Sequence, residues 1–364
     1  MIFGGTFDPP HKGHLHLLQT ALEQVQCDRV LLIPAYQPPH KSHHPALSFE
    51  NRVEVLKAWF KDIPNLEISD IEQKRGGKSF TYETVDTLQD LYPDDKLYLL
   101  IGTDMFLSFE EWKCFEDLLK TVVLVVGSRE IGDRSAIEMQ KEHLLKNYVC
   151  KGIILCNMEP LVFASSSLRS LGGGIAEQIL GYINENLDSK RVRHTLLVAD
   201  YARNLAEKFG IDLEKTYLAA LLHDCTKCQS DQWHIDYAKE NGIELTADDL
   251  ACPQVLHQIT APIFAQKTFG VEDLEILSAI GCHTTGKAGM SSLDRLIFFA
   301  DGCEPTRAYP GVEELRAIAE QDLNLATLRL LEHTIDYINV KNAYLHPQTL
   351  FAMREISKEL NQNG

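Results

Sequence analysis

Short apolar runs alternate with amphipathic segments in the first half of the chain. Residues 29–34, 96–101 and 121–126 are rich in Val, Leu and Ile, and each run ends near a Gly or a Pro. Such continuous runs are typical of strands buried on both faces of a parallel sheet. Residues 15–26 and 50–60 have the apolar spacing of helices. The alternation predicts a doubly wound α/β domain with a parallel sheet.

The second half has a different pattern, in which helical spacing continues and strand patterns almost disappear from about residue 175. Three segments show the helical spacing most clearly: 192–209, 213–223 and 274–280. A run of three glycines, 172–174, separates the halves and indicates a flexible connection. We therefore expect an α/β domain over residues 1–171, a linker over 172–184 and an all-α domain over 185–364.

Composition and charge narrow the classes of function. The 364 residues carry a formal net charge of −17, and 45% of them are hydrophobic, which is ordinary for a globular protein. Such acidity disfavours non-specific nucleic-acid binding, but it does not exclude substrates that carry phosphate. No apolar run reaches about 18 residues, so a membrane span is excluded. The start lacks a secretory pattern and the nine cysteines fit reduced thiols, so we expect a cytoplasmic protein without membrane or nucleic-acid partners.

The first candidate site is the string Gly4-Gly-Thr-Phe-Asp-Pro-Pro-His-Lys-Gly-His14, which follows the short apolar start of the chain. Glycines such as Gly5 let a backbone approach a ligand closely. A helix that begins near Gly13 directs free N–H groups and its positive end at that ligand. His11 and His14 are three residues apart, so both can face one pocket. The string predicts a site for an anion such as a triphosphate, with a plain Gly-Pro turn and surface histidines as the alternative.

A second anion site is predicted near the end of the first half. Ser165 and Ser166 precede Arg169 in a segment that has the form of a helix start. Serines cap helix N-termini, and a guanidinium one turn into the helix can bind phosphate through two hydrogen bonds. Taken alone, an ordinary helix cap is the better explanation of this segment.

Together, the two elements resemble the nucleotidyltransferase superfamily, with its His-x-Gly-His and Ser-Ser-Thr-x-x-Arg signatures. Four further segments narrow the resemblance to the bacterial nicotinate-nucleotide adenylyltransferases: 37–41, 79–82, 101–104 and 112–113. The resemblance covers about residues 1–170 and implies a Rossmann-like nucleotidyltransferase domain. It also implies a reaction in which the phosphate of nicotinate mononucleotide attacks the α-phosphorus of ATP and gives deamido-NAD and pyrophosphate. No protein nucleophile is needed, which fits a site built for positioning and charge stabilisation.

The same resemblance implies the residues of this site. His11 and His14 bind the ATP phosphates, and Lys41 neutralises phosphate charge. The other contacts are the phosphate-binding residues Gly4, Gly5, Thr6, Ser165, Ser166 and Arg169, the ribose contacts Gly102 and Asp104, and the pyridine contacts Thr81, Tyr82 and Trp112. Mg²⁺ is expected to enter with ATP. For Tyr82 and Trp112, packing in the domain is an equally good explanation.

The second half contains a series of potential metal ligands in or beside helical segments. In chain order they are His194, His223, Asp224, His257, His283 and Asp301. Imidazole and carboxylate ligands suit iron, manganese, cobalt or zinc and do not suit calcium. Two metals that share a carboxylate can activate water for attack on phosphorus. Any one of these residues alone is better explained as structural, and only their joint order carries the prediction. Asp200 and Asp236 are expected to be solvated helix residues outside the site.

This order resembles the HD superfamily of metal-dependent phosphohydrolases, and the two extra histidines imply a dinuclear centre. The strings 222–227, 281–286 and 299–307 narrow the resemblance to the symmetrical dinucleoside-tetraphosphate hydrolases, over about residues 185–360. The implied reaction cleaves diadenosine tetraphosphate to two ADP. We assign one metal to His194, His223, Asp224 and Asp301, with Asp224 bridging, and the second metal to His257 and His283.

Other residues near these ligands have two explanations. Lys227 and Arg307 are candidate phosphate-binding groups, or they are surface charges. Four cysteines near the ligands are expected to pack helices and not to bind metal: Cys225, Cys228, Cys282 and Cys303. Iron is the expected metal, with manganese, cobalt or zinc as alternatives, because such sites follow availability as much as affinity.

The leading hypothesis is a bifunctional enzyme that uses ATP, nicotinate mononucleotide and diadenosine tetraphosphate. In one alternative, the helical domain is a nucleotide-sensing regulatory module. In another, it hydrolyses a different nucleotide phosphoester, because metal ligands define the chemistry and not the substrate. The sequence leaves this choice and the oligomeric state open.

Overall fold

The computed structural model describes residues 1–38, 45, 47–127, 134–157 and 173–363. Four predicted phosphate contacts lie outside these residues: Lys41, Ser165, Ser166 and Arg169. The chain divides into two compact units, Met1–Leu168 and Arg169–Gly364. Among the described residues, none of the helices combines the length and the apolar character that a membrane span requires.

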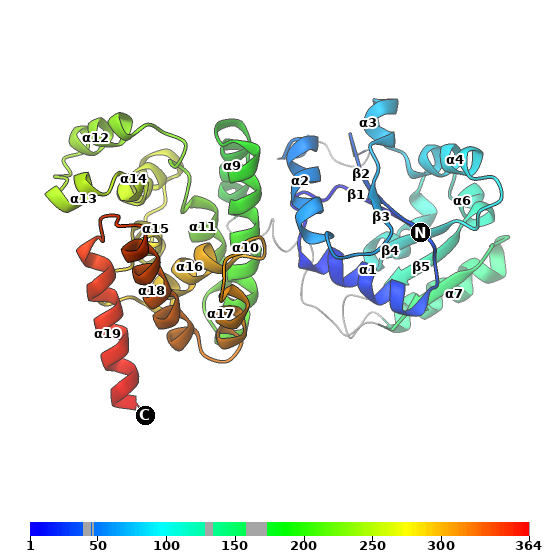
Figure 1. The fold of residues 1–364 in the computed structure, drawn as a ribbon. Helices are drawn as coiled ribbons and strands as arrows, with labels where there is room; N and C mark the ends of the chain where they lie inside the picture. The colour runs from blue at the N-terminus through cyan, green and yellow to red at the C-terminus, as the bar shows by residue number, and fades with distance from the viewer. Residues whose placement is uncertain (39–44, 46, 128–133, 158–172, 364) are drawn as a thin grey trace. The chain divides into compact units, whose positions relative to one another are not determined.

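The first unit is built around a parallel sheet of six strands in the order β3-β2-β1-β4-β5-β6 (Figure 1). The strands are β1 (Ile2–Gly5), β2 (Val30–Pro34), β3 (Leu66–Ile68), β4 (Tyr98–Gly102), β5 (Val123–Gly127) and β6 (Ile153–Cys156). In the parallel register, Ile2 of β1 lies opposite Leu31 of β2 and Leu99 of β4. The strand order reverses between β1 and β4, which places a crevice at their carboxyl ends.

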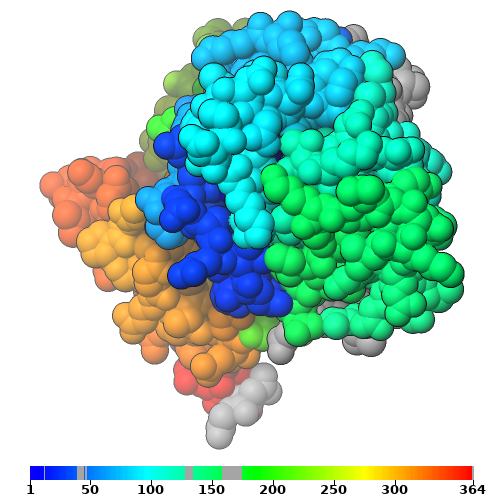
Figure 2. All heavy atoms as spheres, turned by 90° about the vertical axis from the view of Figure 1, so that its right-hand side faces the viewer, coloured from blue at the N-terminus to red at the C-terminus, as the bar shows by residue number. Residues whose placement is uncertain are grey.

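Helices cover both faces of this sheet. They are α1 (Lys12–Gln24), α2 (Phe49–Trp59), α3 (Ile71–Arg75), α4 (Thr81–Leu91), α5 (Thr103–Leu107), η1 (Phe109–Glu111), α6 (Phe115–Thr121) and α7 (Arg134–Asn147). On one face, Leu32 and Leu100 belong to a core with residues of α1 and α2. On the other face, Leu99 and Val126 belong to a core with residues of α4, α6 and α7. The cyan to green part of the chain, to which α4, α6 and α7 belong, fills much of the face turned to the viewer in the space-filling view (Figure 2).

The doubly wound α/β prediction for this half is confirmed. The three apolar runs form β2, β4 and β5, and the two helical segments form α1 and α2. The sequence analysis missed β3 and β6, which have only three and four residues. Segments of this length offer too few positions for a strand pattern to be recognised.

The second unit is all-helical in its described residues, as predicted. Its helices are α9 (Gly173–Asn186), α10 (Ser189–Phe209), α11 (Leu213–Leu222), α12 (Asp231–Glu240), α13 (Ala247–Ala251), η2 (Pro253–Val255), α14 (Leu256–Phe269), α15 (Leu274–Cys282), α16 (Ser292–Cys303), α17 (Val312–Ala319), α18 (Leu323–Val340) and α19 (Pro347–Asn363). The helices α10, α11 and α15 coincide with the three predicted segments. α11 packs against α10 and α15, and α16 packs against all three (Figure 1).

Helix α9 occupies most of the segment that we expected to be a flexible linker, so that expectation is wrong for residues 173–184. Ala176, Ile179, Leu180 and Ile183 are buried at helical spacing, and α9 packs against α10, α11 and α14. The amphipathic spacing outweighs Gly173 and Gly174, which stand in the first turn of the helix.

Candidate active sites

The first candidate site lies at the carboxyl ends of β1 and β4. β1 ends in Gly4 and Gly5, and the chain continues through Thr6 toward α1. β4 ends in Gly102, and Asp104 lies in the first turn of the following helix, α5. Because β1 and β4 are parallel neighbours, these two sets of predicted contacts reach the same edge of the sheet. In open α/β sheets, ligands bind in this crevice.

His11 and His14 come together at the start of α1. Their ring centroids are 3.8 Å apart, and both side chains are buried. Nδ1 of His11 accepts a hydrogen bond from the N–H of Gly13 at 3.1 Å, and Nδ1 of His14 accepts one from the N–H of His11 at 3.3 Å. Because each Nδ1 is an acceptor, a neutral ring carries its proton on Nε2. Both rings therefore present an N–H donor beside a helix N-terminus, where an anion is stabilised.

Arg52, which the sequence analysis did not single out, supports the phosphate-binding turn. Its side chain is only 1% exposed. Nη1 donates to the carbonyl oxygens of Thr6 at 2.6 Å and Ala35 at 2.8 Å, so it joins the loops that follow β1 and β2. Burial lowers the pKa of Arg52, but a guanidinium stays charged in proteins. In the sequence this residue is one charge in an amphipathic pattern, and nothing there marks it as buried.

Tyr82 and Trp112 pack on the core of the first unit. Tyr82 follows Thr81 in the first turn of α4, and the ring of Trp112 lies 5.1 Å from that of Phe109. Both side chains are only partly buried, so packing is compatible with a ligand contact, and that contact stays a prediction. Lys113, to which we gave no role, places Nζ 5.0 Å from the ring centroid of Tyr82.

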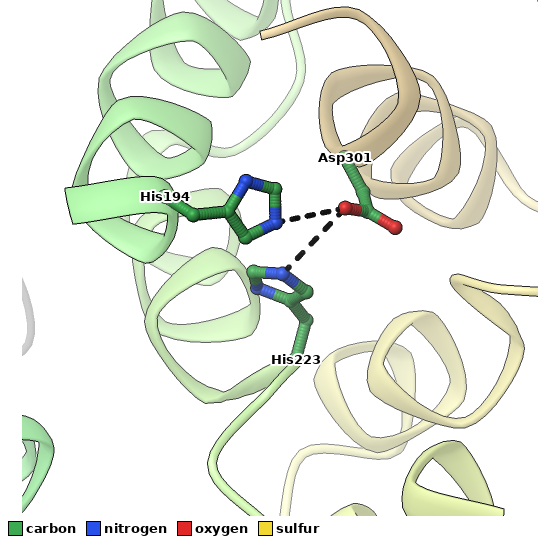
Figure 3. A group of neighbouring side chains, drawn as sticks. All are labelled: His194, His223 and Asp301. Carbon is green, nitrogen blue, oxygen red and sulfur yellow. Dashed lines mark ion pairs between the residues drawn. The ribbon is translucent and has the colours of Figure 1, made fainter. Parts of the chain in front are cut away.

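The second candidate site joins five helices of the second unit. The potential metal ligands form two groups, His194 with His223 and Asp301, and Asp224 with His257 and His283, and within each group the ligand atoms lie within 4.8 Å of one another. Oδ1 of Asp301 is 2.9 Å from Nε2 of His194 and 4.0 Å from Nε2 of His223 (Figure 3). The structure therefore assembles all six residues that the sequence singled out, with Asp224 grouped with His257 and His283 and not with the first set, to which we assigned it as a bridging ligand.

Asp224 lies between the two groups. Its Oδ2 is 3.4 Å from Nε2 of His223 and 3.7 Å from Nε2 of His194. Its Oδ1 is 3.2 Å from Nε2 of His257 and 3.6 Å from Nε2 of His283. Each carboxylate oxygen thus faces its own pair of imidazoles, which is the geometry that a bridging carboxylate requires.

Hydrogen bonds to backbone carbonyls hold two of the imidazoles with Nε2 directed at the centre. Nδ1 of His223 lies 2.6 Å from the carbonyl oxygen of Ala220, and Nδ1 of His283 lies 2.7 Å from that of Ile280. A carbonyl only accepts, so each Nδ1 carries the proton and each Nε2 offers its lone pair. Within the described part of the chain, Nε2 of His223 is buried without a hydrogen-bond partner. A metal ion would satisfy this atom, and the donor set as a whole fits divalent transition metals.

The charge states of Asp224 and His257 suit a metal, whereas that of His194 does not. Burial opposes ionisation of Asp224, yet the neighbouring imidazoles hold its pKa well below the usual value. Burial lowers the pKa of His257 to about 3, so this ring is neutral at pH 7. Burial acts in the same direction on His194, but hydrogen bonds to Asp301 and Glu304 raise its pKa to about 9. A metal must therefore displace a proton from His194.

Three cationic side chains contact these ligands. Nζ of Lys227 is 3.0 Å from Nδ1 of His257. Nη2 of Arg307 is 2.9 Å from Oδ1 of Asp301. Nη1 of Arg191 pairs with Oδ2 of Asp224. Lys227 and Arg307 thus border the candidate centre. The sequence analysis did not single out Arg191. It lies one helical turn before His194 on the same helix face, and that spacing is a signal that could have found it.

Two expectations about neighbouring residues are wrong. Asp200 is only 5% exposed, because α11 and α16 pack on α10 and cover this part of it. Its carboxylate accepts a hydrogen bond from Arg203 at 2.9 Å. Asp236 is exposed as expected. Cys228 is also exposed, with Sγ 3.8 Å from Oδ2 of Asp188, whereas three cysteines are buried: Cys225, Cys282 and Cys303. Among the described residues, no cysteine belongs to a group of potential metal ligands.

Comparisons with known proteins divide the chain at the same place. The cytidylyltransferase-like family matches residues 2–169, and the HD domain family matches residues 191–306. A Mycoplasma genitalium protein named "Probable nicotinate-nucleotide adenylyltransferase/Ap4A hydrolase" is 28% identical over 355 residues, which are 92% of this chain and 97% of that relative.

Two other relatives match one unit each. A "Probable nicotinate-nucleotide adenylyltransferase" of Clostridium tetani is 36% identical over 169 residues, which are 46% of this chain and 84% of the relative. A "Bis(5'-nucleosyl)-tetraphosphatase, symmetrical" of Bacillus subtilis is 36% identical over 174 residues, which are 48% of this chain and 92% of the relative. The chain therefore belongs to the nicotinate-nucleotide adenylyltransferase family through its first unit and to the HD-domain family of symmetrical bis(5'-nucleosyl)-tetraphosphatases through its second.

Proposed function

We propose that the protein is a bifunctional enzyme with one active site in each unit. The first site transfers AMP from ATP to nicotinate mononucleotide and gives deamido-NAD and pyrophosphate. The second hydrolyses diadenosine tetraphosphate to two ADP. The proposal is carried by one observation, the assembled six-residue ligand cluster that follows an adenylyltransferase unit in the same chain, in the order of the Mycoplasma relative.

The first site works by positioning and charge stabilisation. The Nε2–H groups of His11 and His14 donate to the triphosphate and stabilise the charge that develops as pyrophosphate leaves. Arg52 holds the carbonyl oxygen of Thr6, so the turn keeps its shape as a phosphate approaches. Mg²⁺ that enters with ATP neutralises phosphate charge.

Other residues complete the two substrate subsites of this unit. Gly102 and Asp104 bind the adenosine ribose at the edge of the sheet. The remaining phosphate contacts are Lys41, Ser165, Ser166 and Arg169, and the pyridine contacts are Thr81, Tyr82 and Trp112. The shared edge of β1 and β4 supports this arrangement, because it brings the phosphate and ribose contacts to one crevice.

The second site is built to hold metal and phosphate together. His194, His223 and Asp301 would hold one ion, His257 and His283 the other, and Asp224 both. When bound, such a pair supplies Lewis acidity and lowers the pKa of a water molecule. Lys227 and Arg307 bind phosphate oxygens and neutralise the departing ADP. One water is consumed as the central P–O–P bridge breaks, so each product is ADP.

Two finer assignments belong to the same proposal. Iron is the proposed metal, and the same imidazole and carboxylate ligands would also accept manganese, cobalt or zinc. The cytoplasm is the proposed compartment. It is supported by the nine cysteines, all of which lie in the described residues as free thiols.

Cross-inactivation of the full chain tests the two-site proposal. His14→Asn should lower adenylyl transfer at least about a hundredfold and leave hydrolysis intact, and His223→Ala should do the reverse. Both reactions are assayed on each variant, with products separated by ion-exchange chromatography. ADP as the only product of diadenosine tetraphosphate supports symmetrical cleavage, whereas AMP with ATP contradicts it. Hydrolysis of another nucleotide, or control of adenylyl transfer by a bound nucleotide, would favour the alternative roles of the helical unit.

A further inference from the structure

The second site brings together three carboxylates and three cationic side chains. The carboxylates are Asp224, Asp301 and Glu304, and the cations are Arg191, Lys227 and Arg307. The two arginines pair with these carboxylates in the metal-free chain. Divalent ions bound to Asp224 and Asp301 would add positive charge to the site, because each ion carries more charge than the carboxylate that it contacts. The loaded site therefore favours an anion with several charges.

Arg191 contacts a carboxylate oxygen that a bound metal would also contact. Its Nη1 pairs with Oδ2 of Asp224, the oxygen that also faces His194 and His223. A metal held by those two imidazoles therefore meets the guanidinium at the same oxygen. Like charges repel, so a metal at this oxygen would weaken the hold of Asp224 on the guanidinium.

The backbone of Arg191 is anchored by a helix cap, whereas its side chain is partly exposed to solvent. The backbone N–H donates to the capping carboxylate of Asp188 at 2.9 Å, in the first turn of α10. The side chain is 29% exposed, whereas that of Asp224 is 3% exposed. The guanidinium therefore reaches the buried carboxylate from the rim of the site, and the rim is where a phosphate chain would arrive.

We propose that Arg191 is a third phosphate-binding residue of the second site, held on Asp224 until a metal ion takes that oxygen and the guanidinium turns to a polyphosphate. A guanidinium binds phosphate through two parallel hydrogen bonds, so it suits this ligand better than a point charge does. The inference rests on the proposed metal centre and adds to it a residue and an order of events. Metal binds first, and the polyphosphate then binds to the released cation.

Metal binding to the full chain tests the first step. Mn²⁺ is titrated calorimetrically into chelator-stripped wild-type protein, Arg191→Ala and Arg191→Gln. Lys190→Ala is the matched control, because Lys190 is the exposed neighbour on the same turn. Both Arg191 variants should bind Mn²⁺ at least as tightly as the wild type, since the competing cation is gone. Either variant suffices if the other fails to fold.

Polyphosphate binding tests the second step. Tripolyphosphate is titrated into the loaded proteins at a fixed free Mn²⁺ concentration, and His223→Ala measures the binding that the first unit contributes. The Arg191 variants should bind tripolyphosphate about tenfold more weakly, the equivalent of one charged hydrogen bond, and Lys190→Ala should match the wild type. A tenfold loss of Mn²⁺ affinity with unchanged tripolyphosphate binding would overturn the inference, because Arg191 would then only orient Asp224.

The outcomes separate this inference from the proposed activity. If loaded protein binds tripolyphosphate through Arg191 but leaves diadenosine tetraphosphate intact, the substrate assignment fails and the role of Arg191 stands. If the wild type cleaves the tetraphosphate and the Arg191 variants match it in both titrations, the role of Arg191 fails alone.

Discussion

Asp224→Asn tests the two-metal arrangement most sharply. The substitution keeps the size of the side chain but replaces one carboxylate oxygen with an NH₂ group, which has no lone pair to offer a metal. The two oxygens of Asp224 face different pairs of imidazoles at distances from 3.2 to 3.7 Å. The amide can therefore serve only one of the two groups.

The magnitude follows from the charge that is lost. At an effective dielectric constant near 20, a carboxylate and a single positive charge about 3.5 Å away attract each other by about 5 kcal/mol. That energy corresponds to more than about a thousandfold in binding constant, so at least one ion should be lost. Folding should suffer less, because the partner cation, Arg191, is 29% exposed and can be solvated when its ion pair with Asp224 is removed.

Metal content and both activities are measured on one preparation. After reloading, Asp224→Asn should hold at most one transition metal per chain and should lose diadenosine tetraphosphate hydrolysis at least about a hundredfold. Adenylyl transfer should persist, because the first unit has its own core and site. Asp236→Asn, an exposed carboxylate on α12, is the matched control and should retain two metals. Two metals bound to Asp224→Asn with wild-type affinity would refute the bridging role.

Three other perturbations separate the two units and test the packing. Chelation should abolish hydrolysis and lower the melting temperature, while adenylyl transfer returns with Mg²⁺; a calorimetric scan that shows no change contradicts metal binding. His14→Asn should lower kcat for adenylyl transfer by about 10²–10³, and a change in KM alone would count against charge stabilisation by this ring. Gly302→Ala should destabilise the protein to urea by about 1–3 kcal/mol, since the added Cβ would lie 2.7 Å from Cδ2 of Leu330. Gly181→Ala, where a Cβ meets nothing within 4 Å, is its control and should be neutral or stabilising by up to about 1 kcal/mol.

The sequence predicted those parts of the fold that have a strong local signal. β2 is buried at all five positions, and its apolar run is visible without any tertiary information. The short strand β3 has no such run and is recognisable only beside β2, to which it pairs. The glycines at the start of α9 suggested a linker, but burial of Ile179 and Ile183 against neighbouring helices decided the outcome.

In the candidate sites, too, the sequence predicted the residues that have a strong signal and missed those that do not. The six ligands could be named because their residue types and order point to one chemistry, and the structure brings them together. Arg52 and Asp200 could not be assigned in this way, since a charged residue in an amphipathic helix is usually solvated. For Arg191, the spacing from His194 was the one available signal. Only tertiary packing places Arg52 on two carbonyl oxygens and Arg191 on Asp224.

The most direct test of a metal-dependent second active site is one measurement on chelator-free wild-type protein. Transition metals per chain are counted, and the products of diadenosine tetraphosphate are identified on the same sample. We predict close to two metals per chain and ADP as the only product. Near-zero metal after reloading, with the tetraphosphate intact, would contradict the second active site and leave an adenylyltransferase joined to a regulatory helical unit.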